Sequence, residues 1–212
     1  MTDRSSQTTV PDSRRTQAER TALAESRMIG AAIDLLNTVG VSGATLKAIG
    51  EEAGYSRGLA THHFGGKAGL FRSLLREVHA AFLEDLHSRV GERTGLEALE
   101  AANEAHRDFV QRHRDRLRAM YILWFGALDP GSDFKPNVAR FMARQRETMA
   151  DWIRGGQATG EIPDHVDANR MARQIYGNLV GVNLQWLIDA SLNLSEAYAD
   201  MRTDMRCLLG QT

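Results

Sequence analysis

Apolar residues of this chain recur at helical spacing from about residue 21 onward. In the first predicted helix, which ends near Gly40, positions i, i+3, i+4 and i+7 are Ile29, Ala32, Ile33 and Leu36. The same spacing predicts further helices over about 45–53, 56–64, 67–82, 95–113, 116–127, 138–152, 166–190 and 195–209. Because polar and apolar residues nowhere alternate between turn signals as they would in a strand, we expect an all-α protein of about nine helices.

The first twenty residues differ in composition from the rest. Residues 1–20 are rich in Ser, Thr, Gln and Arg and offer almost no apolar surface to a core. We therefore expect them to form a disordered, solvated arm, although an arm that follows the minor groove of DNA is the alternative.

Charge and cysteine content limit the classes of function. The 212 residues carry a formal net charge of -1, so a nucleic-acid partner would need a local basic patch. The single Cys207 excludes an internal disulfide framework and a cysteine zinc finger. The sequence has neither an apolar run of about 20 residues nor the apolar core of a signal peptide. We expect a soluble, cytoplasmic protein without a membrane partner.

Residues 44–64 contain the most specific local pattern. A short helix, a tight turn at Gly54-Tyr55 and a second short helix capped by Ser56 form a helix-turn-helix motif. Small residues at the start of the second helix permit close approach to a major groove about 12 Å wide. Residues 56–79 contain four Lys and Arg against one Glu, a local excess of three positive charges.

The run from Ala31 to Leu70 resembles the N-terminal domain of the TetR family of bacterial transcriptional regulators. The matching residues, in fixed spacing, are Gly40, Thr45, Ala53-Gly54, Ser56-Arg57-Gly58, His63-Phe64, Lys67 and Leu70. The resemblance implies a three-helix DNA-binding domain at residues 21–66 and a helical effector-binding and dimerisation domain at residues 67–212. It further implies a homodimeric repressor that a small apolar or aromatic effector releases from a near-palindromic double-stranded DNA operator.

The resemblance also implies which residues meet DNA. Thr45 and Lys47 at the second helix would anchor phosphates. Arg57, Gly58, Leu59 and Thr61 would face the groove, and His62, His63 and Lys67 would contact the DNA backbone. The implied DNA-binding residues are Thr45, Lys47, Ser56, Arg57, Gly58, Leu59, Thr61, His62, His63 and Lys67. We expect Arg57 to read a base, because a guanidinium can bond a guanine edge at two points. Thr61 stands where the family usually has Tyr, so the base preference of relatives does not carry over.

Two clusters of polar residues have competing interpretations. His62 and His63 could suggest a metal site, but adjacent helical residues point to different faces and lack a thiol or carboxylate cluster, so we expect none. Five arginines between residues 107 and 118 could form a second nucleic-acid patch, or one of them could turn inward to bind a ligand carboxylate. Because Asp108 and Asp115 interrupt the run, we favour a solvated helix end.

Large apolar residues in the second half of the chain could fill an ordinary core or line a ligand cavity. The residues alone leave both open, and the family resemblance favours the cavity. The expected ligand-binding residues are Phe109, Met120, Tyr121, Trp124, Phe125, Tyr176, Asn183 and Trp186.

The last two predicted helices carry an apolar stripe that could pack within the chain or form the interface of a homodimer. The resemblance favours the dimer, through Ile175, Leu179, Val182, Met201 and Met205. Gly177 and Gly181, four residues apart, would permit close approach of a second backbone.

The alternative class of function is an all-helical small-molecule carrier or enzyme. Since the sequence shows no phosphate loop, usable triad spacing or acidic metal cluster, we expect no enzyme and no cofactor.

Overall fold

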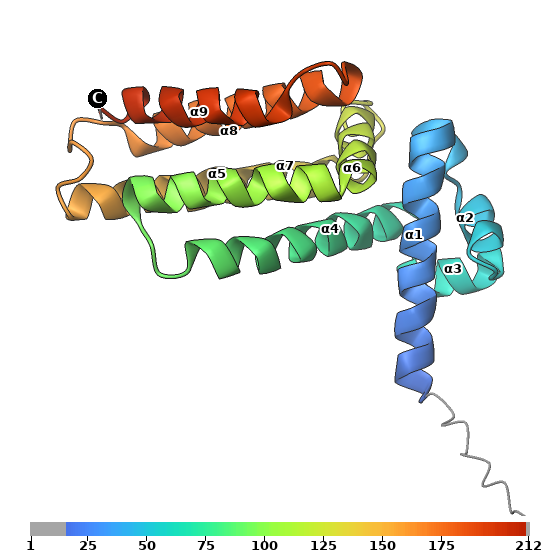
Figure 1. The fold of residues 1–212 in the computed structure, drawn as a ribbon. Helices are drawn as coiled ribbons and strands as arrows, with labels where there is room; N and C mark the ends of the chain where they lie inside the picture. The colour runs from blue at the N-terminus through green and yellow to red at the C-terminus, as the bar shows by residue number, and fades with distance from the viewer. Residues whose placement is uncertain (1–15, 211–212) are drawn as a thin grey trace, which may run out of the picture.

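The computed structural model describes residues 16–210, which form nine α-helices and no strand (Figure 1). The helices are α1 (Gln17–Gly43), α2 (Leu46–Glu52), α3 (Arg57–Phe64), α4 (Lys67–Val90), α5 (Gly95–Arg112), α6 (Arg114–Gly126), α7 (Lys135–Ala158), α8 (Ala168–Ile188) and α9 (Leu194–Leu208). The all-α prediction with about nine helices is therefore confirmed for this part of the chain. None of the helices in residues 16–210 is long and apolar enough to cross a membrane.

The first helix begins earlier than the sequence pattern predicts. Thr16 caps it: the Thr16 hydroxyl accepts a bond from Glu19 N (3.2 Å), and the Glu19 carboxylate accepts one from Thr16 N (2.7 Å). The prediction of a disordered arm over residues 1–20 is thus wrong for 17–20, because this capping box satisfies the first free N–H groups of α1. Residues 1–15 lie outside the described residues. At the other end, the predicted stop at Gly40 corresponds to a kink, where Gly40 adopts φ 70° and ψ -173°.

The first three helices and the start of α4 share one apolar core. Met28 and Leu36 of α1 pack with Ile49 of α2, and Phe64 of α3 and Phe71 of α4 join the same cluster. α4 begins at Lys67, one residue after the predicted domain boundary, then runs out of this core to the remaining helices (Figure 1). It therefore belongs to both parts of the molecule.

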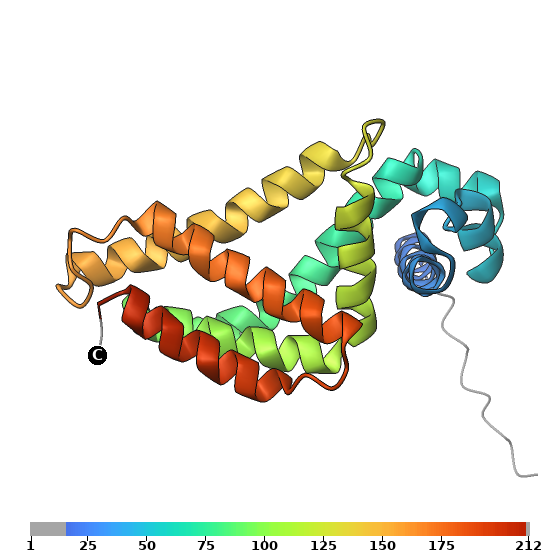
Figure 2. The ribbon, with the colours of Figure 1, turned by 90° about the horizontal axis from the view of Figure 1, so that it is seen from above.

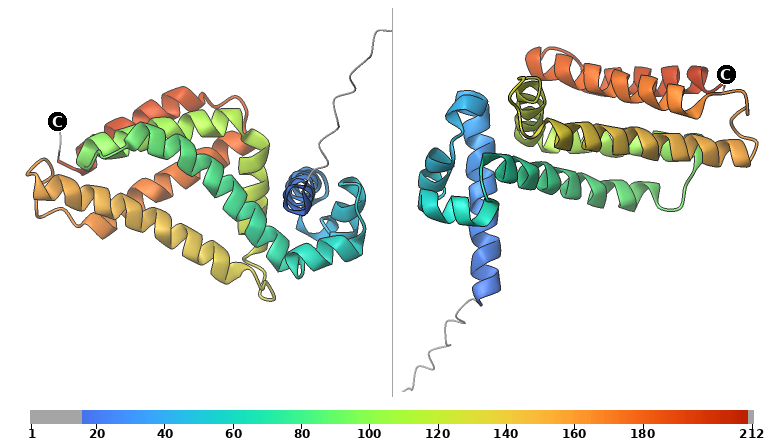
Figure 3. Two further views of the ribbon diagram at one scale, coloured as in Figure 1. Left: turned by 90° about the horizontal axis from the view of Figure 1, so that it is seen from below. Right: turned by 180° about the vertical axis from the view of Figure 1, so that it is seen from behind.

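The remaining helices form three tiers beside the N-terminal helices. α4 lies on one side, α5 and α7 lie in the middle, and α8 and α9 lie on the other side, as the front and rear views agree (Figures 1 and 3). α6 crosses the ends of these tiers next to α1, which is clearest from above (Figure 2). This crossing helix is consequently a second direct connection, beside α4, between the two parts of the chain.

Specific bonds fix this contact between α1 and α6. Asn37 Nδ2 of α1 donates to the carbonyl oxygen of Asp115 in α6 (3.0 Å). The apolar core is continuous here, since buried residues of α1 and of α6, Leu117 and Leu123 among them, belong to one cluster. A movement of α6 would therefore be transmitted to α1 through packed side chains.

Candidate nucleic-acid interface and ligand cavity

The turn between α2 and α3 is built from local bonds that the sequence specifies. The Thr45 hydroxyl accepts a bond from Ala48 N, and the Ser56 hydroxyl accepts one from Leu59 N, each at 3.1 Å. Between the helices Gly54 has φ 78°, a conformation that favours glycine. Ser56 and the first turn of α3, Arg57 and Gly58, are exposed.

Four of the ten predicted DNA-contacting residues lie exposed on α3. Arg57, Gly58, Thr61 and His62 are exposed, whereas Leu59 and His63 are half-buried. The Thr61 hydroxyl donates to the Arg57 carbonyl (3.0 Å), so its methyl and oxygen are held on the helix surface. Within residues 16–210, Arg57 makes no ion pair, and its guanidinium can therefore meet an external acceptor.

The two lysines of the predicted set are placed differently. Lys47 is exposed and lies 3.9 Å from the carboxylate of Glu51, one turn along α2. Lys67 donates to the Val41 carbonyl oxygen and lies over the Phe71 ring, 5.6 Å from its centroid. Burial lowers the pKa of the Lys67 ammonium. Lys67 thus fastens the start of α4 to the end of α1, and its expected phosphate contact stays a prediction.

Two other polar clusters are explained within the chain. Of the five arginines between 107 and 118, Arg107 pairs with Asp108, Arg112 with Asp85 and Arg116 with Glu77, at 2.8, 2.5 and 3.3 Å. The run is thus largely engaged in internal ion pairs instead of forming a free basic patch. No group of three or more His, Cys, Asp or Glu in the described part of the chain could hold a metal ion.

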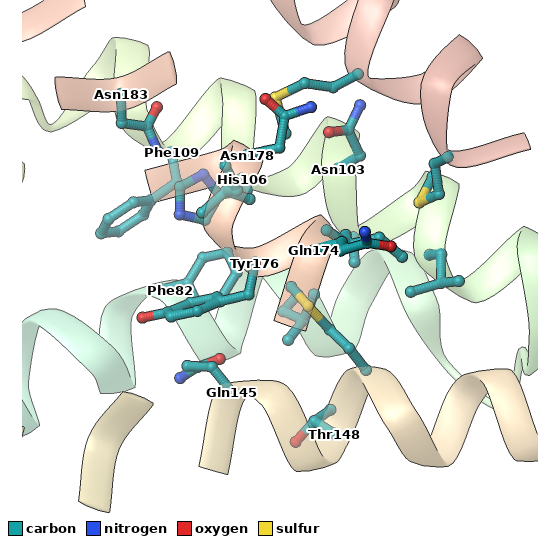
Figure 4. A pocket seen from close by; sticks show the side chains of 18 of the residues that line it. Phe82, Asn103, His106, Phe109, Gln145, Thr148, Gln174, Tyr176, Asn178 and Asn183 are labelled. Carbon is teal, nitrogen blue, oxygen red and sulfur yellow. The ribbon is translucent and has the colours of Figure 1, made fainter. Parts of the chain in front are cut away.

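A cavity of about 420 Å³ lies among α4 to α9 (Figure 4). Most of its wall is apolar, which suits a small molecule with few polar groups. Six of the eight predicted ligand-binding residues line it: Phe109, Met120, Tyr121, Trp124, Tyr176 and Asn183.

The other two predicted ligand-binding residues do not line the cavity. Phe125 follows Trp124 by one position, which turns it by about 100° around α6, to a side where 52% of it is exposed. Trp186 lies near the end of α8, and the Arg114 guanidinium stacks on its ring at 5.0 Å from the centroid. Both assignments were therefore wrong, because residue type alone does not tell which face of a helix a side chain occupies.

The predicted dimer contacts are also placed inside the chain. Ile175 and Leu179 of α8 and Met201 and Met205 of α9 are buried and line the cavity, so they are not on a free surface. Val182 is half-buried and packs against the main apolar cluster. The apolar stripe with Ile175, Leu179, Met201 and Met205 faces inward, which corrects the assignment of these four residues to a dimer interface. The dimer contact of Val182 stays a prediction.

A polar relay from three helices reaches the cavity wall. His106 Nδ1 of α5 lies 2.7 Å from the Tyr198 hydroxyl of α9, which in turn bonds Asn183 Oδ1 of α8 at 2.9 Å. Asn103 Nδ2 donates to the Tyr198 carbonyl oxygen at 3.0 Å, which steadies the same helix. Burial lowers the pKa of His106 to about 4, so the imidazole is neutral near pH 7.

Sequence reasoning did not assign His106 to the ligand site. His106 lies three residues before Phe109 and four before Val110, on the buried stripe of α5. That position was the only feature of the sequence that pointed to the cavity. His79 is a second histidine of the wall, 3.3 Å from Gln145 Nε2, and burial followed by the charge of Arg144 lowers its pKa.

The fold and these two sites define a helical protein in which a helix-turn-helix domain joins a second domain that encloses a cavity. Residues 28–74 match the family described as "Bacterial regulatory proteins, tetR family". This match confirms the resemblance to the TetR family seen in the sequence, over residues 28–74 of the chain.

Known proteins are similar to parts of this sequence or to its fold. HTH-type transcriptional regulator BetI 1 of Chromohalobacter salexigens is 33% identical over 90 residues, covering 42% of each chain. The match thus spans about two fifths of that relative's length. Among solved structures, the fatty acid degradation regulator FadR of Bacillus halodurans has a TM-score of 0.75 at 18% identity, covering 88% of this chain and 95% of its own. SmeT of Stenotrophomonas maltophilia has a TM-score of 0.72 at 19% identity, covering 86% and 88%.

Proposed function

We propose that this chain is a cytoplasmic, homodimeric DNA-binding transcriptional repressor, without enzymatic activity, that a small molecule in the cavity releases from its operator. The observation that carries the proposal is the free first turn of α3. Its Arg57, Gly58 and Thr61 are exposed side by side, within the segment that matches the TetR family. That surface is exposed and includes small residues, which permits close approach to a major groove.

The relatives support both the DNA and the effector parts of the proposal. BetI 1 is a transcriptional regulator, and SmeT is the repressor of a multidrug efflux pump. A structure with a TM-score of 0.75 to this chain is the SmeT–triclosan complex, so a protein of this fold binds a small molecule. The cavity of about 420 Å³ provides the corresponding space here.

The dimer is proposed on the face of α8 that carries the two predicted glycines, and not on the inward apolar stripe. Gly177 and Gly181 of α8 have open space where a Cβ would stand, so a second backbone could approach there. Two copies joined in this way would present two recognition helices to successive half-sites, which gives specific affinity that one short helix lacks.

Effector control would act through the elements shared by both sites. α4 supplies His79 and Phe82 to the cavity wall and also carries Phe71 in the N-terminal core, while α6 contacts both the cavity and α1. A ligand that binds the released state more tightly than the DNA-competent state would shift the population through these helices.

The test is selection of bound duplexes from a random pool at about 0.15 M salt, which suppresses part of the nonspecific phosphate binding. We expect enrichment of a two-fold-symmetric sequence, which Arg57→Ala loses. Arg118→Ala is the matched control, because Arg118 is also exposed but lies on α6, away from the helix-turn-helix. A folded wild-type chain that enriched nothing, with or without cavity ligands, would instead identify a carrier.

A further inference from the structure

The polar relay behind the cavity wall determines what a ligand must offer. We infer that the cavity binds an uncharged, mainly apolar molecule whose O–H or N–H group donates to Nε2 of His106, as a substituted phenol does. This inference rests on the proposed effector role of the cavity and specifies the chemistry of the effector.

The Tyr198 hydroxyl has a single proton, and its position fixes that of the His106 proton. The Tyr198 proton is donated to Asn183 Oδ1, 2.9 Å away. A hydroxyl has one proton to donate, so toward His106 Nδ1 at 2.7 Å the Tyr198 oxygen must accept. The proton in that bond therefore belongs to Nδ1, and the neutral ring keeps its lone pair on Nε2.

The orientation of the Asn183 amide agrees with this direction. The amide also interacts with the Tyr121 hydroxyl, without forming a well-aligned hydrogen bond. Since Tyr121 donates its own proton to the Val180 carbonyl at 2.8 Å, its oxygen offers only lone pairs to Asn183. The amide NH₂ should consequently face Tyr121, which leaves Oδ1 to accept from Tyr198.

The other nitrogen of the His106 ring, Nε2, is available to a ligand. No described residue makes a hydrogen bond to this atom, and it is not among the side-chain atoms that are both covered and unpartnered. His106 lines the cavity beside Phe82 and Phe109, and the Phe82 ring meets the imidazole edge-on at 5.1 Å (Figure 4). The acceptor therefore opens on a pocket with aromatic walls, the environment that an aromatic ring bearing a donor complements.

The charges of the cavity wall favour an uncharged ligand. None of the described residues that line the cavity is Lys or Arg. Arg144 and Arg146 act on His79 and Tyr176 of the wall through their charge but are not part of the lining, so an anion in the cavity would lose its hydration without a cationic partner in the wall. Burial keeps His106 neutral near pH 7. The one carboxylate of the wall, Asp204, is exposed at the margin and offers no enclosed partner for a cation. Uncharged ligands are favoured on both counts.

The experiment uses three probes of one shape: para-phenylphenol, its methyl ether and biphenyl-4-carboxylate. Each is titrated into the full chain without DNA by calorimetry at about pH 7.5, where a histidine of lowered pKa is neutral. We expect the phenol to bind about tenfold more tightly than the ether, the effect of one well-placed hydrogen bond, and the carboxylate to bind most weakly. Any other ranking, or no binding of the phenol, overturns the inference.

Variants assign the preference to the relay. His106→Phe should reduce the advantage of phenol over ether to less than about threefold, because the acceptor is gone. Tyr198→Phe should also reduce this advantage. Without the Tyr198 oxygen as acceptor, the neutral imidazole can carry its proton on Nε2 in place of Nδ1. His87→Phe is the control and should retain the preference, since His87 is exposed on α4 and does not line the cavity. A preference that survives His106→Phe, or disappears in His87→Phe alone, contradicts the inference.

A spectroscopic readout does not depend on the folding of any variant. The ¹⁵N chemical shifts of His106 in the wild-type chain distinguish a protonated from an unprotonated ring nitrogen, and we expect Nδ1 to carry the proton. A proton on Nε2 would overturn the inference. The DNA selection tests the proposed function separately. If no duplex is enriched while the phenol preference holds, the proposed function is wrong and the inferred ligand chemistry stands. If a duplex is enriched but the phenol preference is absent, only the ligand chemistry is rejected.

Discussion

Gly69→Ala tests how closely the recognition helix is fixed to α4. A Cβ at Gly69 would lie 1.7 Å from the Phe64 carbonyl oxygen and 2.9 Å from its carbon, in the last turn of α3. Ordinary contact begins near 3.4 Å, so the two backbones would have to separate by 3.4 − 1.7, which is 1.7 Å. Because the obstacle is backbone, no side-chain rotation relieves it. We expect overpacking of about 3 kcal/mol, the upper end of the usual range.

Alanine also favours the helix by about 1 kcal/mol over glycine, so the net loss should be about 2 kcal/mol. For a chain of this length that lowers Tm by about 4–8 °C. The control is Gly30→Ala in α1, where no atom lies within 4 Å of the added Cβ. It should stabilise the chain by about 0.5–1 kcal/mol. Urea unfolding of both variants, with fluorescence and circular dichroism, gives the two free energies. Equal stability of Gly69→Ala and Gly30→Ala would refute the close approach of α3 and α4.

Three further predictions concern the cap, the recognition surface and the buried histidine. Ser56→Ala removes the acceptor for Leu59 N and should lower the free energy of unfolding by about 1 kcal/mol, measured by urea unfolding; Ser56→Gly should lose only a few tenths. Arg57→Ala should weaken binding to the selected duplex by about 1–3 kcal/mol in a titration and relax the base preference at one position of each half-site. Burial lowers the pKa of His106 from near 6.5 to about 4. Between these two pH values the unfolded chain takes up a proton on this histidine that the folded chain does not. The free energy of unfolding therefore falls as the pH drops below about 6.5, the pKa of the histidine in the unfolded chain. Between about pH 7 and pH 5 the loss should be about 2 kcal/mol, and His106→Phe should remove that part of the pH dependence.

The sequence predicted local structure well because local residues determine it. Ser56 and Thr45 cap their helices as their residue types favour, and Gly40 interrupts α1 where a positive φ is needed. The early start of α1 was missed because the cap depends on a reciprocal pair, Thr16 and Glu19, within a polar segment that lacks an apolar stripe.

The cavity was harder to predict because it depends on which face of each helix turns inward. Phe125 and Trp124 are adjacent and of similar type, yet one is exposed and the other lines the cavity. The apolar stripe with Ile175 and Met201 has the same spacing whether it faces a partner or the chain's own cavity. His106 becomes a ligand-site candidate only once α9 brings Tyr198 against it.

The most direct test of the central claim compares two duplexes in a fluorescence anisotropy titration at about 0.15 M salt: the sequence enriched by selection and the same bases scrambled. We predict that two copies of the chain bind the enriched duplex at least about 10³-fold more tightly than the scrambled one, the lower limit for specific recognition. The phenol that binds the cavity should release the chain from the enriched duplex. Equal affinity for both duplexes would contradict the account of this chain as a sequence-specific regulator.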